Sequence, residues 1–138
     1  MNNIIKCFLT LTPCEKFYNF IKQLPDIENI YICIDNNDYN IPNYDGKIKI
    51  IKIDNKESIT NGFHSCVLAH EKKALSRDKA LYYFYKNNIN YDYIWFIEED
   101  VFIPTIETIK NIDIKYPNND LLVSQHRFPK DQPDWGHW

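Results

Sequence analysis

The stretch that decides the fold runs from residue 91 to residue 104 and reads YDYIWFIEEDVFIP. Its residues 93–97 are bulky, apolar and rich in aromatic and β-branched types, which favours a strand covered on both faces, as in a parallel sheet between helices. Three acids, Glu98, Glu99 and Asp100, end that run. Because side chains alternate along an extended chain, Glu98 and Asp100 are expected on one side and Glu99 on the other. Two converging carboxylates suit Mg²⁺ or Mn²⁺, and a solvated acidic strand end is an equally open alternative.

On either side of this stretch, predicted strands and helices alternate along the chain. Apolar residues recur at helical spacing in some segments and form short apolar or alternating runs in others. The alternation favours an α/β fold, a three-layer sandwich with a mostly parallel sheet. The strand at 47–53, where Lys and Ile alternate, is expected nearer the sheet edge. Beside the acidic strand, the predicted strands are 4–11, 29–34, 47–53 and 120–125. The predicted helices are 15–24, 76–86 and a short one that is capped by Thr105 and carries Ile106, Ile109 and Ile112. Residues 54 to about 75 are predicted as a loop.

Length and composition indicate one packed domain. The chain has 138 residues, which is enough for one proper core and too few for two comfortable ones. A hydrophobic fraction of 44% with 15% aromatic residues argues for a globular protein. The net charge is -3 and no basic run occurs, so the electrostatic signature of nucleic-acid binding is missing. We therefore expect no nucleic-acid partner.

The cysteines and the apolar segments indicate a soluble protein of a reducing compartment. No CxxC spacing occurs, and a thiol in an apolar segment behaves as a small hydrophobic group. Residues 1–13 fit a first strand better than a secretory signal, and no apolar run reaches transmembrane length. We therefore expect a cytoplasmic protein without a membrane span. The cysteines expected to be reduced and structural are Cys7, Cys14, Cys33 and Cys66.

Other sequence signals for chemistry are weak. His64 and His70 flank Cys66, but their spacing fits no standard zinc site, and loop histidines are the better explanation. No nucleophile-elbow signature surrounds Cys66. The chain has neither a G-x-G-x-x-G motif nor a P-loop, which counts against a dinucleotide enzyme or an NTPase.

Polar residues follow several predicted strands. Ligands of open α/β sheets bind outside the carboxyl ends of the strands, which is where Thr10, Thr12, Asp35 and the acidic triplet fall. With the helix at 76–84 before the acidic strand, this order of elements resembles the nucleotide-sugar-binding half of a GT-A fold glycosyltransferase, a Rossmann-like nucleotide-diphospho-sugar transferase. The acidic triplet stands in place of the DxD motif of that family. The resemblance covers roughly residues 4–124.

The resemblance implies a metal-dependent transfer of a sugar. Asp100, at the last DxD position, would bind the Mn²⁺ or Mg²⁺ that bridges the diphosphate of a nucleotide-sugar, in particular a UDP-sugar. Glu98, at the first position, would reach the ribose or, through water, the metal. Glu99 would lie in the nucleotide site and mainly shape the turn. The acceptor would be a hydroxyl of a sugar or a protein.

The same resemblance assigns the remaining nucleotide-binding residues. Asp35 would contact the nucleobase, and Thr10 and Thr12 would line the loop after the first strand. Arg77 or Lys79 would contact the base or a phosphate. A cation there would stabilise the negative charge that develops on the departing diphosphate.

The catalytic side of the chain is expected to be short. Only residues 121–138 remain to build the acceptor site and to supply a catalytic base, and there Asp134 and His137 are the chosen catalytic candidates, with His126 and Asp131 as others. Trp135 and Trp138 would stack on a sugar ring or cover apolar surface.

Two alternatives to an active transferase are open. A catalytically inactive GT-A-like module would keep the binding half and dock a partner through its aromatic tail. An unrelated metal-dependent phosphoryl-transfer domain would need an acid after the first strand, where residues 10–12 offer none.

Overall fold

The computed structural model describes residues 3–42, 46–63, 76–119 and 130, apart from the side chains of 76–78. The chain divides into two compact units, Met1–Glu107 and Thr108–Trp138. The first contains the sheet. The second contains, in its described part, helix α4, Thr108–Lys115. The prediction of one domain stays a prediction.

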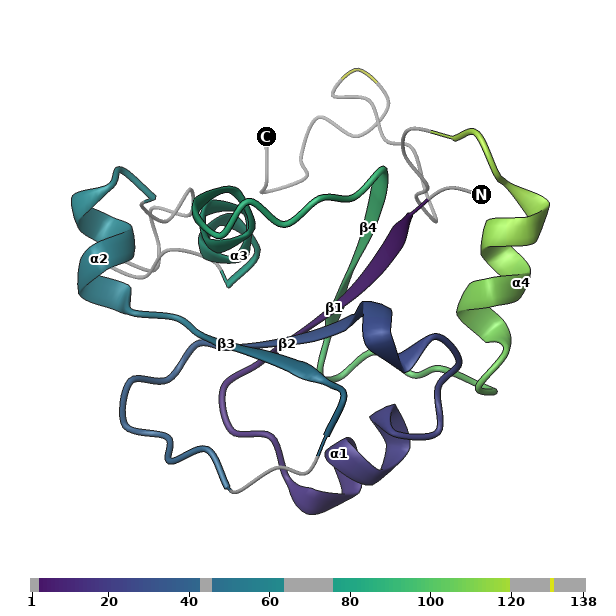
Figure 1. Cartoon of the computed structure of the whole chain (residues 1–138), viewed down its shortest axis with the longest axis horizontal. Helices are drawn as coiled ribbons and strands as arrows, with labels where there is room; N and C mark the ends of the chain where they lie inside the picture. The colour runs from purple at the N-terminus through teal and green to yellow at the C-terminus, as the bar shows by residue number, and fades with distance from the viewer. Residues whose placement is uncertain (1–2, 43–45, 64–75, 120–129, 131–138) are drawn as a thin grey trace. The chain divides into compact units, whose positions relative to one another are not determined.

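The described part of the first unit contains a four-stranded, fully parallel sheet. Its strands are β1 (Ile4–Thr10), β2 (Ile30–Ile34), β3 (Lys49–Lys52) and β4 (Tyr93–Glu98), in the order β3-β2-β1-β4 (Figure 1). The predicted α/β class and mostly parallel sheet are confirmed. Among these strands β3 lies at an edge, as its Lys-Ile alternation predicts.

Helices cover both faces of this sheet. They are α1 (Glu15–Ile21), α2 (Asn55–Thr60) and α3 (Ser76–Lys86), with a short 3-10 helix η1 at Ile27–Asn29. Figure 1 shows α1 and α3 on opposite faces of the sheet, so the unit has three layers. Helix α3 has the predicted bounds. Asn88, which follows it, adopts a left-handed φ of 50°, in keeping with the predicted stop at 87–88.

Alternation along the strands divides the core between the two faces. Cys7 of β1 and Cys33 of β2 pack in one cluster with Phe84 of α3. Phe8 points the other way and meets Phe17 of α1 edge-on, with the ring centres 5.9 Å apart. Odd-numbered residues of β1 and β2 therefore face α3, and even-numbered ones face α1. This rule also places the residues at the strand ends.

The described cysteines are free, as predicted. Cys7 and Cys33 are buried side by side, with 3.4 Å between their Sγ atoms, and Cys14 is exposed. The hydrogen bond to Cys33, together with burial, raises the pKa of the Cys7 thiol far above its usual range. These two cysteines act as small core side chains. Cys66 lies outside the described residues.

Three predicted features were wrong in detail. Helix α2 occupies part of the predicted loop, because Asp54 caps it by accepting hydrogen bonds from the N–H groups of Lys56 (2.8 Å) and Glu57 (3.0 Å). Helix α1 ends at Ile21 and not at residue 24. The backbone N–H groups of residues 23 and 24 donate to the carbonyl oxygens three residues earlier, which is the tighter 3-10 pattern. Helix α4 begins at Thr108, so Thr105 does not cap it.

Strand β4 is less covered than its apolar sequence predicts. Its residues 93–96 are half-buried and only Ile97 is buried. The strand lies at the edge of the sheet in the part of the chain that is described, and its one paired neighbour there is β1. The predicted strand at 120–125 lies outside that part.

Candidate functional site

The order of the strands reverses beside β1. The chain moves outward from β1 to β2 and β3, and then returns to place β4 on the other side of β1. Reversal points of this kind, at the carboxyl ends of the strands, are where open α/β proteins bind ligands. The candidate site is built around the ends of β1 and β4 and the loops that follow them, residues 10–12 and 98–101.

A side-chain hydrogen bond joins these two loops. The buried hydroxyl Oγ1 of Thr10 donates to Oε2 of Glu99, although the residues are 89 positions apart. Thr10 shares the α1 face of β1 with Phe8, so Glu99 reaches toward that face. Glu98 is aligned with Leu9, which packs on the α3 face. Glu98 and Glu99 therefore belong to opposite sides of the sheet, as alternation predicts.

The acidic triplet forms an exposed turn. All three side chains are exposed, and the N–H of Val101 donates to the carbonyl oxygen of Glu98 at 3.1 Å. Within the described residues, no three or more His, Cys, Asp or Glu side chains are grouped to hold a metal ion. Binding of a metal by Glu98 and Asp100 stays a prediction.

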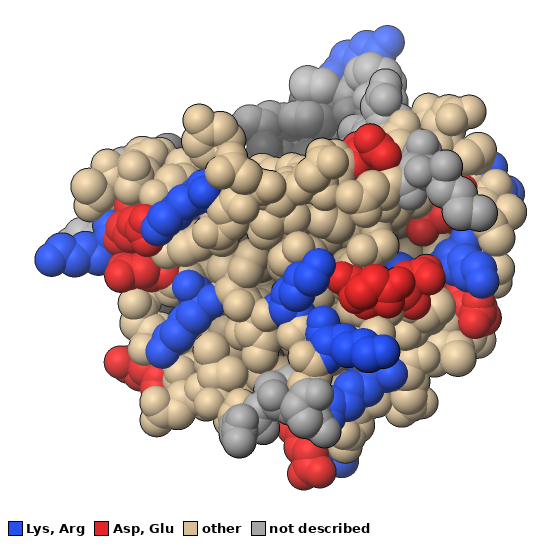
Figure 2. Space-filling view, in the orientation of Figure 1, with Lys and Arg blue, Asp and Glu red and all other residues tan. Residues whose placement is uncertain are grey.

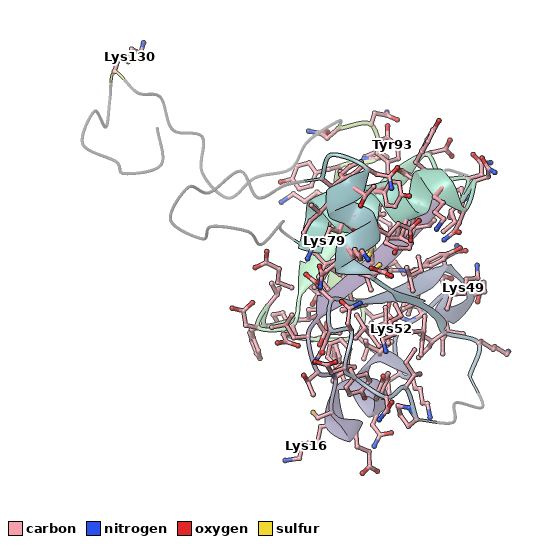
Figure 3. All side chains as sticks on the ribbon, turned by 90° about the vertical axis from the view of Figure 1, so that its left-hand side faces the viewer. Lys16, Lys49, Lys52, Lys79, Tyr93 and Lys130 are labelled. Atoms are coloured by element: carbon pink, nitrogen blue, oxygen red, sulfur yellow. The ribbon has the colours of Figure 1, made fainter. Side chains whose placement is uncertain are left out.

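A buried ion pair lies at the end of β2. Asp35 is fixed by its N–H, which donates to the carbonyl oxygen of Thr10 at 2.9 Å. Its Oδ2 atom accepts a hydrogen bond from Nζ of Lys79 on α3, which Figure 3 labels. The side chains of Lys79 and Asp35 are 3% and 8% exposed, so water screens their interaction little. The α3 face of the site thus holds an ordered cation beside a carboxylate.

Amide side chains extend this pair to the neighbouring loops. Asn55, at the start of α2, accepts a second hydrogen bond from Nζ of Lys79 at 2.6 Å. Its Nδ2 atom donates to Oδ1 of Asn37 at 3.0 Å. On the β1 side, Nδ2 of Asn36 lies 3.4 Å from Oγ1 of Thr12. The loops after three neighbouring strands and helix α3 are therefore linked by polar contacts at one edge.

The structure brings together part of the predicted set. The residues that meet at the carboxyl edge by direct contact or by strand register are Thr10, Thr12, Asp35, Lys79, Glu98 and Glu99. Asp100 follows them on the turn. Helix α3 contains Arg77, whose side chain is outside the described residues. The other candidates outside that range are His64, Cys66, His70, His126, Asp131, Asp134, Trp135, His137 and Trp138.

Two residues of this region escaped prediction, Asn55 and Glu57. Both lie in α2, in a segment predicted as a loop. The pattern Asp54-x-x-Glu57 is a helix-start signal of the capping-box type and identifies α2 from sequence. The contact of Asn55 with Lys79 has no such local signal.

Comparisons with protein-family models, with curated proteins and with solved structures find no match to this chain. None of the helices in the described ranges has the length and apolar character needed to cross a membrane. On the face shown in Figure 2, basic and acidic side chains lie beside one another.

Proposed function

We propose that this protein is a GT-A-type glycosyltransferase that binds a nucleotide-sugar, in particular a UDP-sugar, at the carboxyl edge of its parallel sheet. Two contacts at the reversal point support the proposal: the acidic turn after β4 is bonded to Thr10 at the end of β1, and Asp35, after β2, is paired with Lys79. The strand order supports a ligand at that edge.

The acidic turn suits the metal that such a function implies. Mg²⁺ in phosphate-binding sites keeps several waters and is held by one or two carboxylates together with substrate phosphates, so a cluster of three protein acids is not required. Glu98 and Asp100 would hold the cation, and Glu99, which accepts a hydrogen bond from Thr10, would shape the turn. When bound, the cation neutralises charge on the diphosphate.

The residues of the α3 face would serve the nucleotide. Lys79 has three N–H donors, of which Asp35 and Asn55 receive two. This arrangement favours an ordering role for Lys79, which fixes the Asp35 carboxylate next to the bound base. The same two hydrogen bonds weigh against a direct contact between Lys79 and the phosphates of the nucleotide.

Calorimetric titration with UDP and several UDP-sugars, with and without Mn²⁺, tests the proposal. Binding should require the metal in the wild type. Asp100→Asn should weaken it at least about tenfold, since a neutral amide is a poorer ligand for a hard cation. The matched control is Glu28→Gln, which neutralises an exposed acid of η1, before the amino end of β2.

The outcomes separate the hypotheses. Failure of the wild type to bind UDP with Mn²⁺ overturns the proposal. Metal-dependent binding followed by release of the sugar or its transfer to an acceptor supports the enzyme, whereas binding without turnover indicates the inactive module. Equal effects of Asp100→Asn and Glu28→Gln would remove Asp100 from the metal site.

A further inference from the structure

Helix α3 presents a polar stripe to the first turn of α2. Lys79, Tyr82, Tyr83 and Lys86 are spaced i, i+3, i+4 and i+7, which places them on one face of the helix. Lys79 donates to Asn55, and the other three donate to Glu57. The stripe thus begins in the candidate site at Lys79 and continues along the same face of α3 to Lys86.

Glu57 is the centre of these contacts. Its Oε1 atom accepts hydrogen bonds from Lys86 and, at 2.9 Å, from Tyr82, and its Oε2 atom accepts one from Tyr83 at 2.9 Å. The bonds from Lys86, Tyr82 and Tyr83 lower the pKa of Glu57, because they stabilise its ionised form. One carboxylate therefore ties two turns of α3 to α2.

Tyr83 connects this cluster to the site. Its hydroxyl donates to Glu57 and accepts a hydrogen bond from the N–H of Asp54 at 2.8 Å. Asp54 directly precedes Asn55, the acceptor for Lys79. The segment 54–57 is therefore held against α3 at both ends, with Lys79 at one end and Lys86 at the other.

We propose that Glu57 is a positioning residue of the candidate site, which holds α2 against α3 so that Lys79 stays enclosed between Asn55 and Asp35. Glu57 does not touch the ligand in this scheme. Its loss would remove the bonds that Tyr82, Tyr83 and Lys86 make to α2, let the start of α2 move away from α3 and expose Lys79. The consequence for ligand affinity rests on the proposed function, whereas the effect on Lys79 does not.

Competitive labelling of lysines with an amine-reactive acylating reagent, read by mass spectrometry, measures the exposure of Lys79. The internal standard is Lys6, which is 4% exposed on the α1 face of β1 and donates to the carbonyl oxygen of Pro25 at 3.4 Å. Glu57→Ala should raise labelling of Lys79 about fivefold while Lys6 stays constant. Glu28→Ala, which truncates an exposed acid of η1, is the matched control and should change neither lysine.

Labelling that stays constant at Lys79, or that rises equally at Lys79 and Lys6, overturns the proposal, since the second result reports general destabilisation. If Glu57→Ala does not fold, Tyr83→Phe removes only the hydroxyl between Glu57 and Asp54 and should raise Lys79 labelling about twofold. In a second measurement, Glu57→Ala should weaken binding of UDP with Mn²⁺ about fivefold. If the wild type does not bind UDP, the proposed function fails, and the labelling still decides the role of Glu57.

Discussion

Nζ of Lys79 donates a hydrogen bond to Oδ2 of Asp35, although the two residues are 44 positions apart in the chain. The contact fixes helix α3 to the carboxyl end of β2, and both side chains are nearly excluded from water. A buried pair of this kind depends on both partners, because each compensates the desolvation of the other. It also places an ammonium group and a carboxylate side by side on the α3 face of the candidate site.

Replacing one partner of this pair should destabilise the fold strongly. Lys79→Met leaves the buried Asp35 carboxylate without its ammonium and should lower the free energy of unfolding by about 3 kcal/mol. The double variant Asp35→Leu with Lys79→Met should recover a large part of that loss, because no buried charge remains. Urea denaturation of the wild type, both single variants and the double variant measures this. Additive losses in the double variant would show that the two side chains act independently.

The start of α2 depends on its cap. Asp54→Ala removes the acceptor for two N–H groups and should lower the free energy of unfolding by about 1 kcal/mol, whereas Asp54→Asn, which can still cap, should lower it by less. Urea denaturation compares the variants. If the asparagine variant loses as much as the alanine one, the charge of Asp54 matters more than its hydrogen bonds.

Stability should fall in alkali through Tyr83. Burial, with the nearby Glu57 and Asp54 carboxylates, raises the pKa of its phenol from 10.0 to about 12. Because the pKa is higher in the folded state, the stabilisation is complete below pH 10 and is lost as the pH rises from 10 to about 12. Thermal unfolding across this range should show a smaller decline for Tyr83→Phe than for the wild type. Tyr85→Phe, at a residue that is 84% exposed, should follow the wild type.

The hydrogen bond between the loops after β1 and β4 should contribute to stability. Thr10→Val conserves shape but removes the donor to Glu99, and it should lower the free energy of unfolding by about 1 kcal/mol. A double-mutant cycle with Glu99→Ala isolates the pair, and its coupling energy should be about 0.5 kcal/mol or more. Thr12→Val is the control at an exposed threonine of the same loop. A coupling energy of zero would show that the contact does not join the loops.

Local patterns in the sequence predict most elements of the sheet unit. The apolar run at 93–97 predicts β4, and the Lys-Ile alternation at 47–53 predicts an edge strand. Spacing of apolar residues and a stop at Asn87 and Asn88 give the bounds of α3. These features are readable because periodicity and capping act between residues close in the chain.

The candidate site is only partly predictable in the same way. The position of Thr10, Asp35 and the acidic triplet after strands predicts that they share one edge. The partner of Lys79 does not follow from the resemblance, which directs this lysine toward a base or a phosphate, whereas the structure gives it Asp35 and Asn55. Glu57 carries no signal beyond its helix-start pattern, although it receives three hydrogen bonds from α3.

The sequence by itself determined the α/β class and the acidic end of β4, because strand burial and helix faces impose periods that a short segment displays. Only the tertiary structure decided that β4 lies beside β1, that Glu99 accepts a hydrogen bond from Thr10 and that Lys79 donates one to Asp35. The Thr10–Glu99 and Asp35–Lys79 pairs are 89 and 44 positions apart, and they form only when the parallel sheet and the covering helix bring these distant residues together. Thr10 and Lys79 are buried there and need hydrogen-bond partners from the protein.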